Sequence, residues 1–370
     1  TAGVSSLLFD QSGVLWVGTY GGGLCRLAQA GAWADPAKAP FECFQNRVSQ
    51  PDSIGSNSVT ALLEDHSGVL WIGTYGSGAN KLPPAYKPFT ILRNDPENLT
   101  SLASDMVFAL FFDGPDVLWA GTIDQGLERI DLPSGKVTHY RSQASDPDTL
   151  SDNFVRAIYR DRTGQLWIGT NKGLNRLDEN TGKFTRYLSS DKDSIPGDRI
   201  ATIAEAPDGT LWLGLDREGL CHFDPVADTF TLYKHDPEQP NSLADPTIYD
   251  LFVDPDGVVW IGTARQGLDR FDPRSQVFTH FAPDPANAAS ISDPTVLWVR
   301  RYTSGTLWTG TASGLNRLDA QTGGFRAFRM AEGLPNDFVY TFLEDAQGRL
   351  WLSTNKGIAR LDPATSAVKA

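Results

Sequence analysis

Residues 70–78 read LWIGTYGSG, and closely related strings recur along the chain. Aligned on their tryptophan, the copies are marked by Trp16, Trp71, Trp119, Trp167, Trp212, Trp260, Trp308 and Trp351. The steps between them average about 48 residues, the length expected of propeller blades. A glycine-rich string can also cradle a phosphate, but such a site needs a helix directly after the glycines. Here GTYGSGANKLPP runs into Pro83 and Pro84, so the repetition is the informative signal.

The fourth copy gives the strand pattern of one unit. Its β-rich runs cover 154–161, 165–170, 174–178 and 184–187, with Gly164 in the first turn. No segment keeps a 3.6-residue period long enough for a helix. Four short antiparallel strands per unit predict an all-β fold, a β-propeller of four-stranded antiparallel blades. We expect eight blades; the alternative is seven blades with one unit displaced.

The whole chain, 1–370, is predicted to be a single propeller domain. The expected blades span approximately 1–48, 49–100, 101–148, 149–192, 193–240, 241–288, 289–333 and 334–370. Each blade already has its own strands, so we expect the ring to close by packing of the first blade on the last, with a frayed outer strand in the last.

Most repeated residues have structural explanations. The aspartate that closes the first strand of most units is expected to accept N–H groups of the following turn. The tryptophans are expected to fill the space between blades, and the glycine of each Gly-Thr step marks a place where no side chain fits. The aspartates are Asp10, Asp65, Asp113, Asp161, Asp254 and Asp345, with Ala206 and Tyr302 in their place in units five and seven.

Composition excludes several classes of function. The net charge is −13 and there is no Lys/Arg-rich run, which argues against nucleic acid and anionic membranes as partners. No run approaches the ~18 apolar residues of a membrane helix, so the chain is not expected to be membrane-embedded. The sequence starts without methionine, which indicates a segment of a longer protein. No motif for a cofactor, a metal or a catalytic residue is present, so none is predicted.

Strand alignment places Cys25 opposite Cys43 on neighbouring strands of the first unit. Opposed Cβ atoms lie slightly beyond the usual disulfide span, so two buried thiols are favoured and a disulfide is the alternative. Cys221 takes the Cys25 position in the fifth unit, where Leu232 faces it. We therefore expect Cys221 to be a free thiol.

The unit D-x-x-G-x-L-W-[IVL]-G-T-x-x-G-L-x-R-[LF]-D resembles the two-component regulator propeller repeat. The polar links NDPENLTSLASDMV, SDPDTLSDNFV, HDPEQPNSLADPTI and PDPANAASISDPTV strengthen the resemblance. It implies an extracytoplasmic (periplasmic) sensor domain of a membrane-anchored histidine kinase, hybrid regulator or diguanylate cyclase. The transmembrane helix, Tyr-rich sandwich domain and output domain usual in such proteins are not found in these 370 residues. Downstream signalling domains are therefore expected elsewhere.

Three functions compete. The first is a sensor that binds a small molecule or oligosaccharide without catalysis. The second is a protein-interaction scaffold, including a homodimer. The third is an enzyme, because the repeat is also similar to that of virginiamycin B lyase. That chemistry needs a base within reach of the substrate, whereas the five histidines map to an outer strand, a turn or a link. We therefore expect no enzyme activity.

The predicted ligand site lies on the face where first strands start, around the ring axis, where loops converge. Aromatic rings there can stack on sugar faces while charged and amide groups bind hydroxyls. The predicted residues are Tyr20, Tyr75, Phe108, Asp124, Arg156, Asn171, Lys172, Arg199, Asp216, Arg217, Tyr249, Arg265, Tyr340, Asn355 and Lys356, with Gln125 and Gln266 beside them. Arg156, Arg217 and Tyr249 are the first choices, because they come from three different units. The competing interpretation is an ordinary solvated loop surface.

Overall fold

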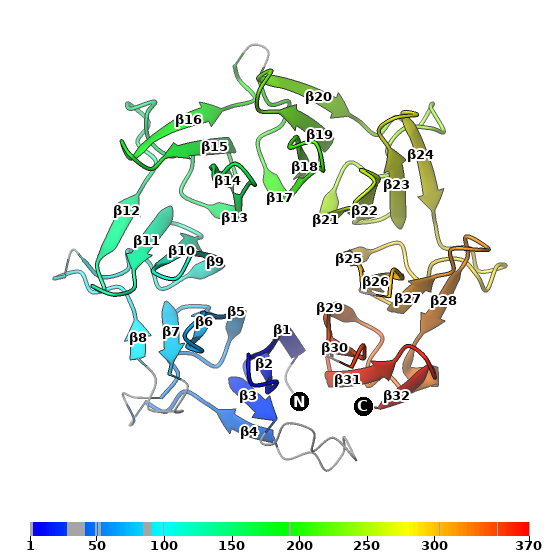
Figure 1. Ribbon diagram of the computed structural model, residues 1–370, viewed down its shortest axis with the longest axis horizontal. Coiled ribbons are helices and arrows are strands. Elements are labelled where there is room, and N and C mark those ends of the chain that lie inside the picture. The colour runs from blue at the N-terminus through cyan, green and yellow to red at the C-terminus, as the bar shows by residue number, and fades with distance from the viewer. Residues whose placement is uncertain are drawn as a thin grey trace.

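The computed structural model is a ring of eight four-stranded antiparallel sheets (Figure 1). The residues it describes are 3–27, 41–48, 50, 53–83, 90–98, 100–191, 194–302, 304–345 and 347–369. The eight-bladed prediction is confirmed, and the seven-bladed alternative is wrong. Within the described residues, the only helical segment is the single 3₁₀ turn η2 (Met330–Glu332).

Each blade runs outward from the ring axis through four consecutive strands, here called A to D. The A strands are β1 (Gly3–Phe9), β5 (Val59–Glu64), β9 (Val107–Asp113), β13 (Val155–Arg160), β17 (Ile200–Glu205), β21 (Ile248–Val253), β25 (Val296–Arg301) and β29 (Val339–Glu344). The B strands are β2 (Leu15–Tyr20), β6 (Leu70–Thr74), β10 (Val117–Thr122), β14 (Leu166–Thr170), β18 (Leu211–Leu215), β22 (Val259–Thr263), β26 (Leu307–Thr311) and β30 (Leu350–Thr354).

The C strands are β3 (Leu24–Leu27), β7 (Ala79–Leu82), β11 (Leu127–Asp131), β15 (Gly173–Asp178), β19 (Gly219–Asp224), β23 (Leu268–Asp272), β27 (Gly314–Leu318) and β31 (Gly357–Asp362). The D strands are β4 (Phe41–Phe44), β8 (Thr90–Leu92), β12 (Val137–Tyr140), β16 (Lys183–Tyr187), β20 (Thr229–Tyr233), β24 (Val277–Phe281), β28 (Phe325–Phe328) and β32 (Ala367–Lys369). We call the face that carries the B–C loops and the inter-blade links the top face. The A–B and C–D turns lie on the bottom face.

The hydrophobic core is divided among the seams between blades. Trp167 of blade four, for example, packs with Ile200, Leu213 and Phe223 of blade five. The same pattern repeats at each seam, so the tryptophans fill the space between blades as predicted.

In the six blades that have the aspartate, the repeated tryptophan is also fixed by a hydrogen bond that sequence reasoning missed. In blade four, Asp161 Oδ1 accepts the backbone N–H groups of Thr163 and Gln165, both at 2.9 Å. Its other oxygen, Oδ2, accepts the indole N–H of Trp167 at 2.7 Å. Burial alone would raise the pKa of Asp161, but these hydrogen bonds outweigh burial and lower it. The aspartate therefore joins the A–B turn to the core in addition to its predicted role in the turn.

The glycine of the Gly-Thr step lets the next blade approach. A Cβ added to Gly169 would lie 2.8 Å from the Cβ and Cγ2 atoms of Ile200, at the start of the A strand of blade five. The prediction that no side chain fits there is confirmed for this glycine.

Blades one and eight close the ring without sharing strands, as predicted. The labelled ends of the chain lie next to each other in Figure 1, and β1 packs against β29 and β30. Trp351 of blade eight lies in the same buried cluster as Val4 and Leu15 of blade one. The outer strand β32 is three residues long, and each is paired with β31. Its fraying stays a prediction.

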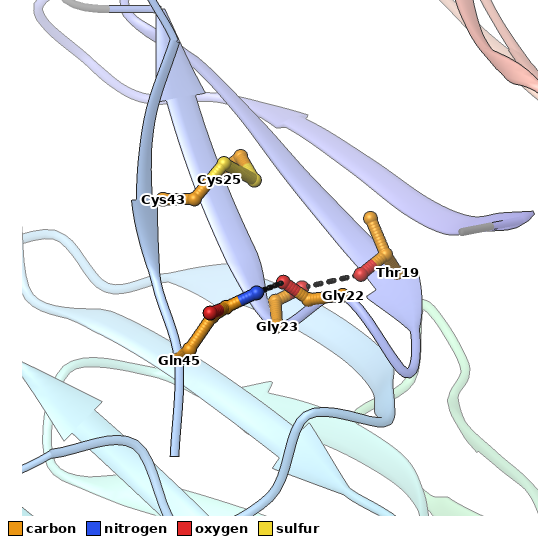
Figure 2. The surroundings of a disulfide bond; sticks show 6 residues. All are labelled: Thr19, Gly22, Gly23, Cys25, Cys43 and Gln45. Atoms are coloured by element: carbon orange, nitrogen blue, oxygen red, sulfur yellow. Dashed lines mark hydrogen bonds between the residues drawn. A yellow bond between two sulfur atoms is a disulfide. The ribbon is translucent and has the colours of Figure 1, made fainter. Parts of the chain in front are cut away.

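Cys25 and Cys43 form a disulfide between β3 and β4 (Figure 2). The predicted register is confirmed, but the favoured pair of buried thiols is wrong. The two Cα atoms lie 4.0 Å apart, closer than the ~4.5 Å of an ordinary non-hydrogen-bonded pair, and Cys43 is exposed. In the same blade Thr19 Oγ1 donates to the carbonyl of Gly23, which fixes the B–C loop. Cys221 is free and buried opposite Leu232, as predicted, and burial raises the pKa of its thiol to about 12.

Candidate functional site

Every A strand carries one extra residue near the top face. In β13, Val155 pairs with Thr170 and Ala157 pairs with Gly169, so Arg156 has no partner in the ladder. Such a bulge re-aims a side chain out of the regular alternation. The same register shift occurs in all eight A strands, and the bulge residues are Ser5, Thr60, Phe108, Arg156, Ala201, Tyr249, Leu297 and Tyr340. The bulge therefore places chemically different side chains at one equivalent position around the ring.

A cleft of about 360 Å³ lies on the top face over blades four, five and six. It is lined by Arg156, Ala201, Asp216, Arg217, Thr247, Ile248, Tyr249, Ala264 and Arg265. Three of these, Arg156, Ala201 and Tyr249, are the bulge residues of successive blades. Because Ala201 ends at a methyl group, it leaves open the space between its two larger neighbours. The volume lies within the range of small-molecule sites in proteins.

Arg156 is held at the edge of the cleft by two groups of its own blade. Its Nε–H donates to Asn171 Oδ1 at 2.5 Å, and its guanidinium lies 4.9 Å from the ring centre of Phe154. Burial lowers the pKa of Arg156; Asp216 opposes this shift and Arg199 adds to it. The guanidinium is therefore partly desolvated and incompletely balanced by negative charge.

The B–C loop of blade five forms the rim. Arg217 adopts a left-handed backbone conformation with φ of 76°, which is unfavourable for a residue with a Cβ. Glycines occupy the equivalent loop position in blades one and two, where Gly21 and Gly76 have φ of 87° and 84°. The carboxylate of Asp216 lies 3.3 Å from Arg199 Nη1 and 3.9 Å from Arg217 Nε. The loop thus keeps an arginine at the rim despite the backbone cost.

On the side of the cleft formed by blade six, one arginine is engaged in a two-point ion pair. Arg265 donates through Nε and Nη2 to the buried carboxylate of Asp245, both at 3.1 Å. This ion pair raises the pKa of Arg265. The ring of Tyr249 beside it is 48% exposed and is available to stack on a ligand.

The cleft gathers only part of the predicted site. It brings together Arg156, Asp216, Arg217, Tyr249 and Arg265, which include the three first choices. Ligand binding by any of them stays a prediction. Arg199 precedes the A strand and does not line the cleft; the residue equivalent to Arg156 in blade five is Ala201.

A second group of predicted residues contributes exposed aromatic side chains from blades eight, one, two and three. Tyr20 and Tyr340 meet edge to face across the closing seam, with ring centres 6.3 Å apart. The hydroxyl of Tyr340 donates to Asn355 Oδ1 at 2.8 Å. Tyr20, Tyr75 and Phe108 are 51%, 60% and 47% exposed. These rings do not line the cleft, although Phe108 contacts Phe154, whose ring lies against Arg156.

The remaining predicted residues belong neither to the cleft lining nor to this aromatic group. Asn171 positions Arg156, while Lys172 lies 3.8 Å from the carboxylate of Asp152. Asp124 and Lys356 are exposed loop residues.

Sequence reasoning missed Ala201, Thr247, Ile248 and Ala264, but a signal for the bulge was present. Val155 and Ile158 both face the seam with blade three although they are three residues apart. A regular strand alternates with period two, so this spacing indicates an extra residue.

Two other grooves lie on the bottom face. One of about 480 Å³ between blades seven and eight is lined in part by Tyr302, Trp308 and Arg317. The other, about 240 Å³, lies between blades one and two. In the groove between blades seven and eight, Arg317 Nη1 donates to the carbonyl of Pro363 at 3.3 Å. The cleft on the top face is therefore smaller than the groove between blades seven and eight. What distinguishes the cleft from these grooves is its charged side chains and the bulge residues that line it.

Among the described residues, no three His, Cys, Asp or Glu side chains are grouped as a metal site would require. His139, His222 and His280 lie on C or D strands, and none lines the cleft. No helix in the described part of the chain is long and apolar enough to cross a membrane.

The sequence profile of the two component regulator propeller matches residues 53–76, 149–172, 242–265 and 333–356. Each match covers the end of a link, an A strand with its bulge, a B strand and the start of a B–C loop. Four of the eight blades each contain a match to the two component regulator propeller repeat. Two of these repeats, in blades four and six, carry Arg156, Tyr249 and Arg265, and hence both flanks of the cleft.

Solved structures with the same fold come from different kinds of protein. The extracellular domain of the putative hybrid two component system BT3049 from B. thetaiotaomicron is 21% identical, with a TM-score of 0.63, over 100% of this chain and 52% of that one. PorZ, a surface component of the type-IX secretion system of Porphyromonas gingivalis, is 19% identical, with a TM-score of 0.61, over 97% and 52%. The computationally designed Ika8 protein is 14% identical, with a TM-score of 0.64, over 97% and 96%.

These identities establish the fold alone, and a fold shared by a sensor and a secretion component does not decide function. The chain spans about half the length of the two natural structures. A search of curated proteins finds no match.

Proposed function

We propose that this propeller is the ligand-sensing, extracytoplasmic domain of a bacterial membrane-anchored signalling receptor. It binds a small polar molecule or an oligosaccharide in the cleft of blades four to six and performs no chemistry on it. The observation that carries the proposal is the cleft itself, where two component regulator propeller repeats place Arg156 and Tyr249 on either side of a small alanine. The fold similarity to the extracellular domain of a hybrid two component system supports this class of protein.

A binding screen tests the proposal. The chain is titrated with small molecules and oligosaccharides by calorimetry, and each hit is repeated with the triple variant Arg156→Ala, Arg217→Ala, Tyr249→Ala. Loss of binding is expected, since the variant removes the side chains that wall the cleft. Lys136→Ala with Arg274→Ala, on exposed C–D turns of the bottom face, is the control that should still bind. A ligand that binds the triple variant unchanged, or that occupies the groove beside Trp308, contradicts the proposal.

The exposed aromatic side chains of blades one to three favour a second candidate, a protein-interaction or dimerisation scaffold. Exposed aromatic side chains are enriched at protein interfaces, and Tyr20, Tyr75 and Phe108 are about half exposed on the top face. Light scattering after size-exclusion chromatography tests whether the chain forms a dimer. A mass of 40.3 kDa at every concentration excludes self-association, whereas a dimer that dissociates in Tyr75→Ser with Phe108→Ser supports it.

A further inference from the structure

We propose that the ligand of the cleft carries an anionic group, a carboxylate or a sulfate ester, which the guanidinium of Arg156 binds. This inference rests on the proposed function and specifies the chemical class of its ligand. The first observation is the balance of charge. The cleft is lined by three arginines and one aspartate, although the chain as a whole carries a net charge of −13.

The second observation is how the three arginines are engaged. Arg265 is neutralised by its two-point contact with Asp245. Asp216 is shared between Arg217 and Arg199. For Arg156, the described residues supply no carboxylate within 4.0 Å, and its only hydrogen bond leaves from Nε.

The third observation is the orientation of Arg156. Because Asn171 takes the Nε proton and Phe154 lies against the guanidinium, the two Nη nitrogens have no hydrogen-bond partner among the described groups. Paired Nη donors fit two oxygens of a carboxylate or sulfate side by side. A guanidinium that is partly desolvated, pre-oriented and without a carboxylate within 4.0 Å among the described residues is favourable to anion binding, because the costs of ordering and of desolvation have already been met.

The other groups define what lies next to the anion. Arg217 stands on the rim as a second positive charge, and the exposed ring of Tyr249 offers an apolar surface on the side of blade six. An acidic saccharide combines these features, because its anionic group can reach Arg156 while a sugar face stacks on Tyr249. The cleft therefore fits an acidic sugar better than a neutral one.

The test uses the full chain and matched sets of oligosaccharides, each as a neutral parent, its uronic acid form and its sulfate ester. We expect an acidic form to bind about 10- to 100-fold more tightly than its parent, the effect of a charge-assisted contact. Whether the uronate or the sulfate binds more tightly identifies the anion. Arg156→Gln should remove that preference, whereas Lys136→Gln should change neither the preference nor the binding of the neutral parent. Raising the salt concentration should weaken the acidic ligand selectively.

Arg156→Lys and Asn171→Ala separate charge from orientation. The lysine keeps the positive charge without the paired donors, and the alanine releases the Nε contact, so both should reduce the preference partially. Unchanged melting temperatures confirm that the variants fold. Equal binding of parent and acidic forms, or an acidic preference that survives Arg156→Gln, overturns the inference while leaving a ligand-binding cleft in place. If no saccharide of either kind binds, the proposed saccharide ligand fails together with this inference.

Discussion

Replacing Asp161 by alanine should destabilise the ring measurably, because one carboxylate holds both a turn and a buried tryptophan. Asp161 is 6% exposed and Trp167 is 1% exposed. The indole N–H of Trp167 would lose its acceptor where water has little access, which costs about 1–3 kcal/mol. The turn N–H groups of Thr163 and Gln165 can reach water instead, so their loss adds about 1 kcal/mol. The expected decrease in the free energy of unfolding is therefore about 2–4 kcal/mol.

This free energy corresponds to a modest change in melting temperature. At roughly 2 cal/mol/K per residue, the 370 residues give an unfolding entropy of about 0.8 kcal/mol/K. Cooperative unfolding would then lower the melting temperature by about 3–5 °C. Calorimetry measures it, and Asp178→Ala is the matched control. Asp178 also accepts hydrogen bonds from its turn, at 3.0 Å from Asn180 N and 2.7 Å from Thr181 Oγ1, but it is exposed and binds no buried group.

The same aspartate predicts a pH dependence with a definite sign. Its native pKa is lowered, so its contribution is fully present above the unfolded value near 3.9 and is lost as the pH falls through the native pKa. The stability difference between the native chain and Asp161→Asn should therefore shrink below about pH 4. A loss under 1 kcal/mol for the alanine variant, a loss equal to that of Asp178→Ala, or a pH-independent difference would refute the reasoning.

Three further outcomes are expected. Replacing Cys25 and Cys43 by serine should cost about 3 kcal/mol in denaturant unfolding, because the bond closes a loop with a sequence separation of 18. Reductant should lower the stability of the native chain by a similar amount and leave the variant unchanged; a native chain that reductant does not destabilise would contradict this. Arg217→Gly should raise the free energy of unfolding by about 0.5–1 kcal/mol, since relief of left-handed strain exceeds the entropy cost of glycine. The same substitution should weaken ligand binding. A lower melting temperature of the variant would exclude backbone strain at this position. Gly169→Ala should destabilise by about 1–3 kcal/mol through collision with Ile200, and a neutral result in the same melting assay would show that the seam can relax.

The fold was predictable because one unit recurs along the chain, so each copy supports the strand assignment of the others. The register was predictable as well, since Cys25 lies opposite Cys43 and Cys221 opposite Leu232. The disulfide itself was not, because average strand spacing does not fix the approach of one pair.

The site was predictable in part, for a physical reason. Side chains in the B–C loops follow from the repeat, so Arg217 and Arg265 were found. The gap above Ala201 was not, because a cavity is created by a small residue between large ones, and small residues carry no chemical signal in a sequence. The left-handed conformation of Arg217 had a signal, because glycine occupies the equivalent position in blades one and two.

The extra residue of the A strand can influence ligand recognition separately from the stability of the fold. At Arg156 and Tyr249 it has no cross-strand partner, so the side chain can change size, charge or polarity without changing the ladder. Ser5 and Thr60 differ, because their hydroxyls donate to the backbone of the next blade. Adaptation to a new ligand then requires only single substitutions at bulge positions such as Arg156 and Tyr249, where recognition can change with little effect on folding. At these positions, specificity can diversify at a rate that stability does not limit.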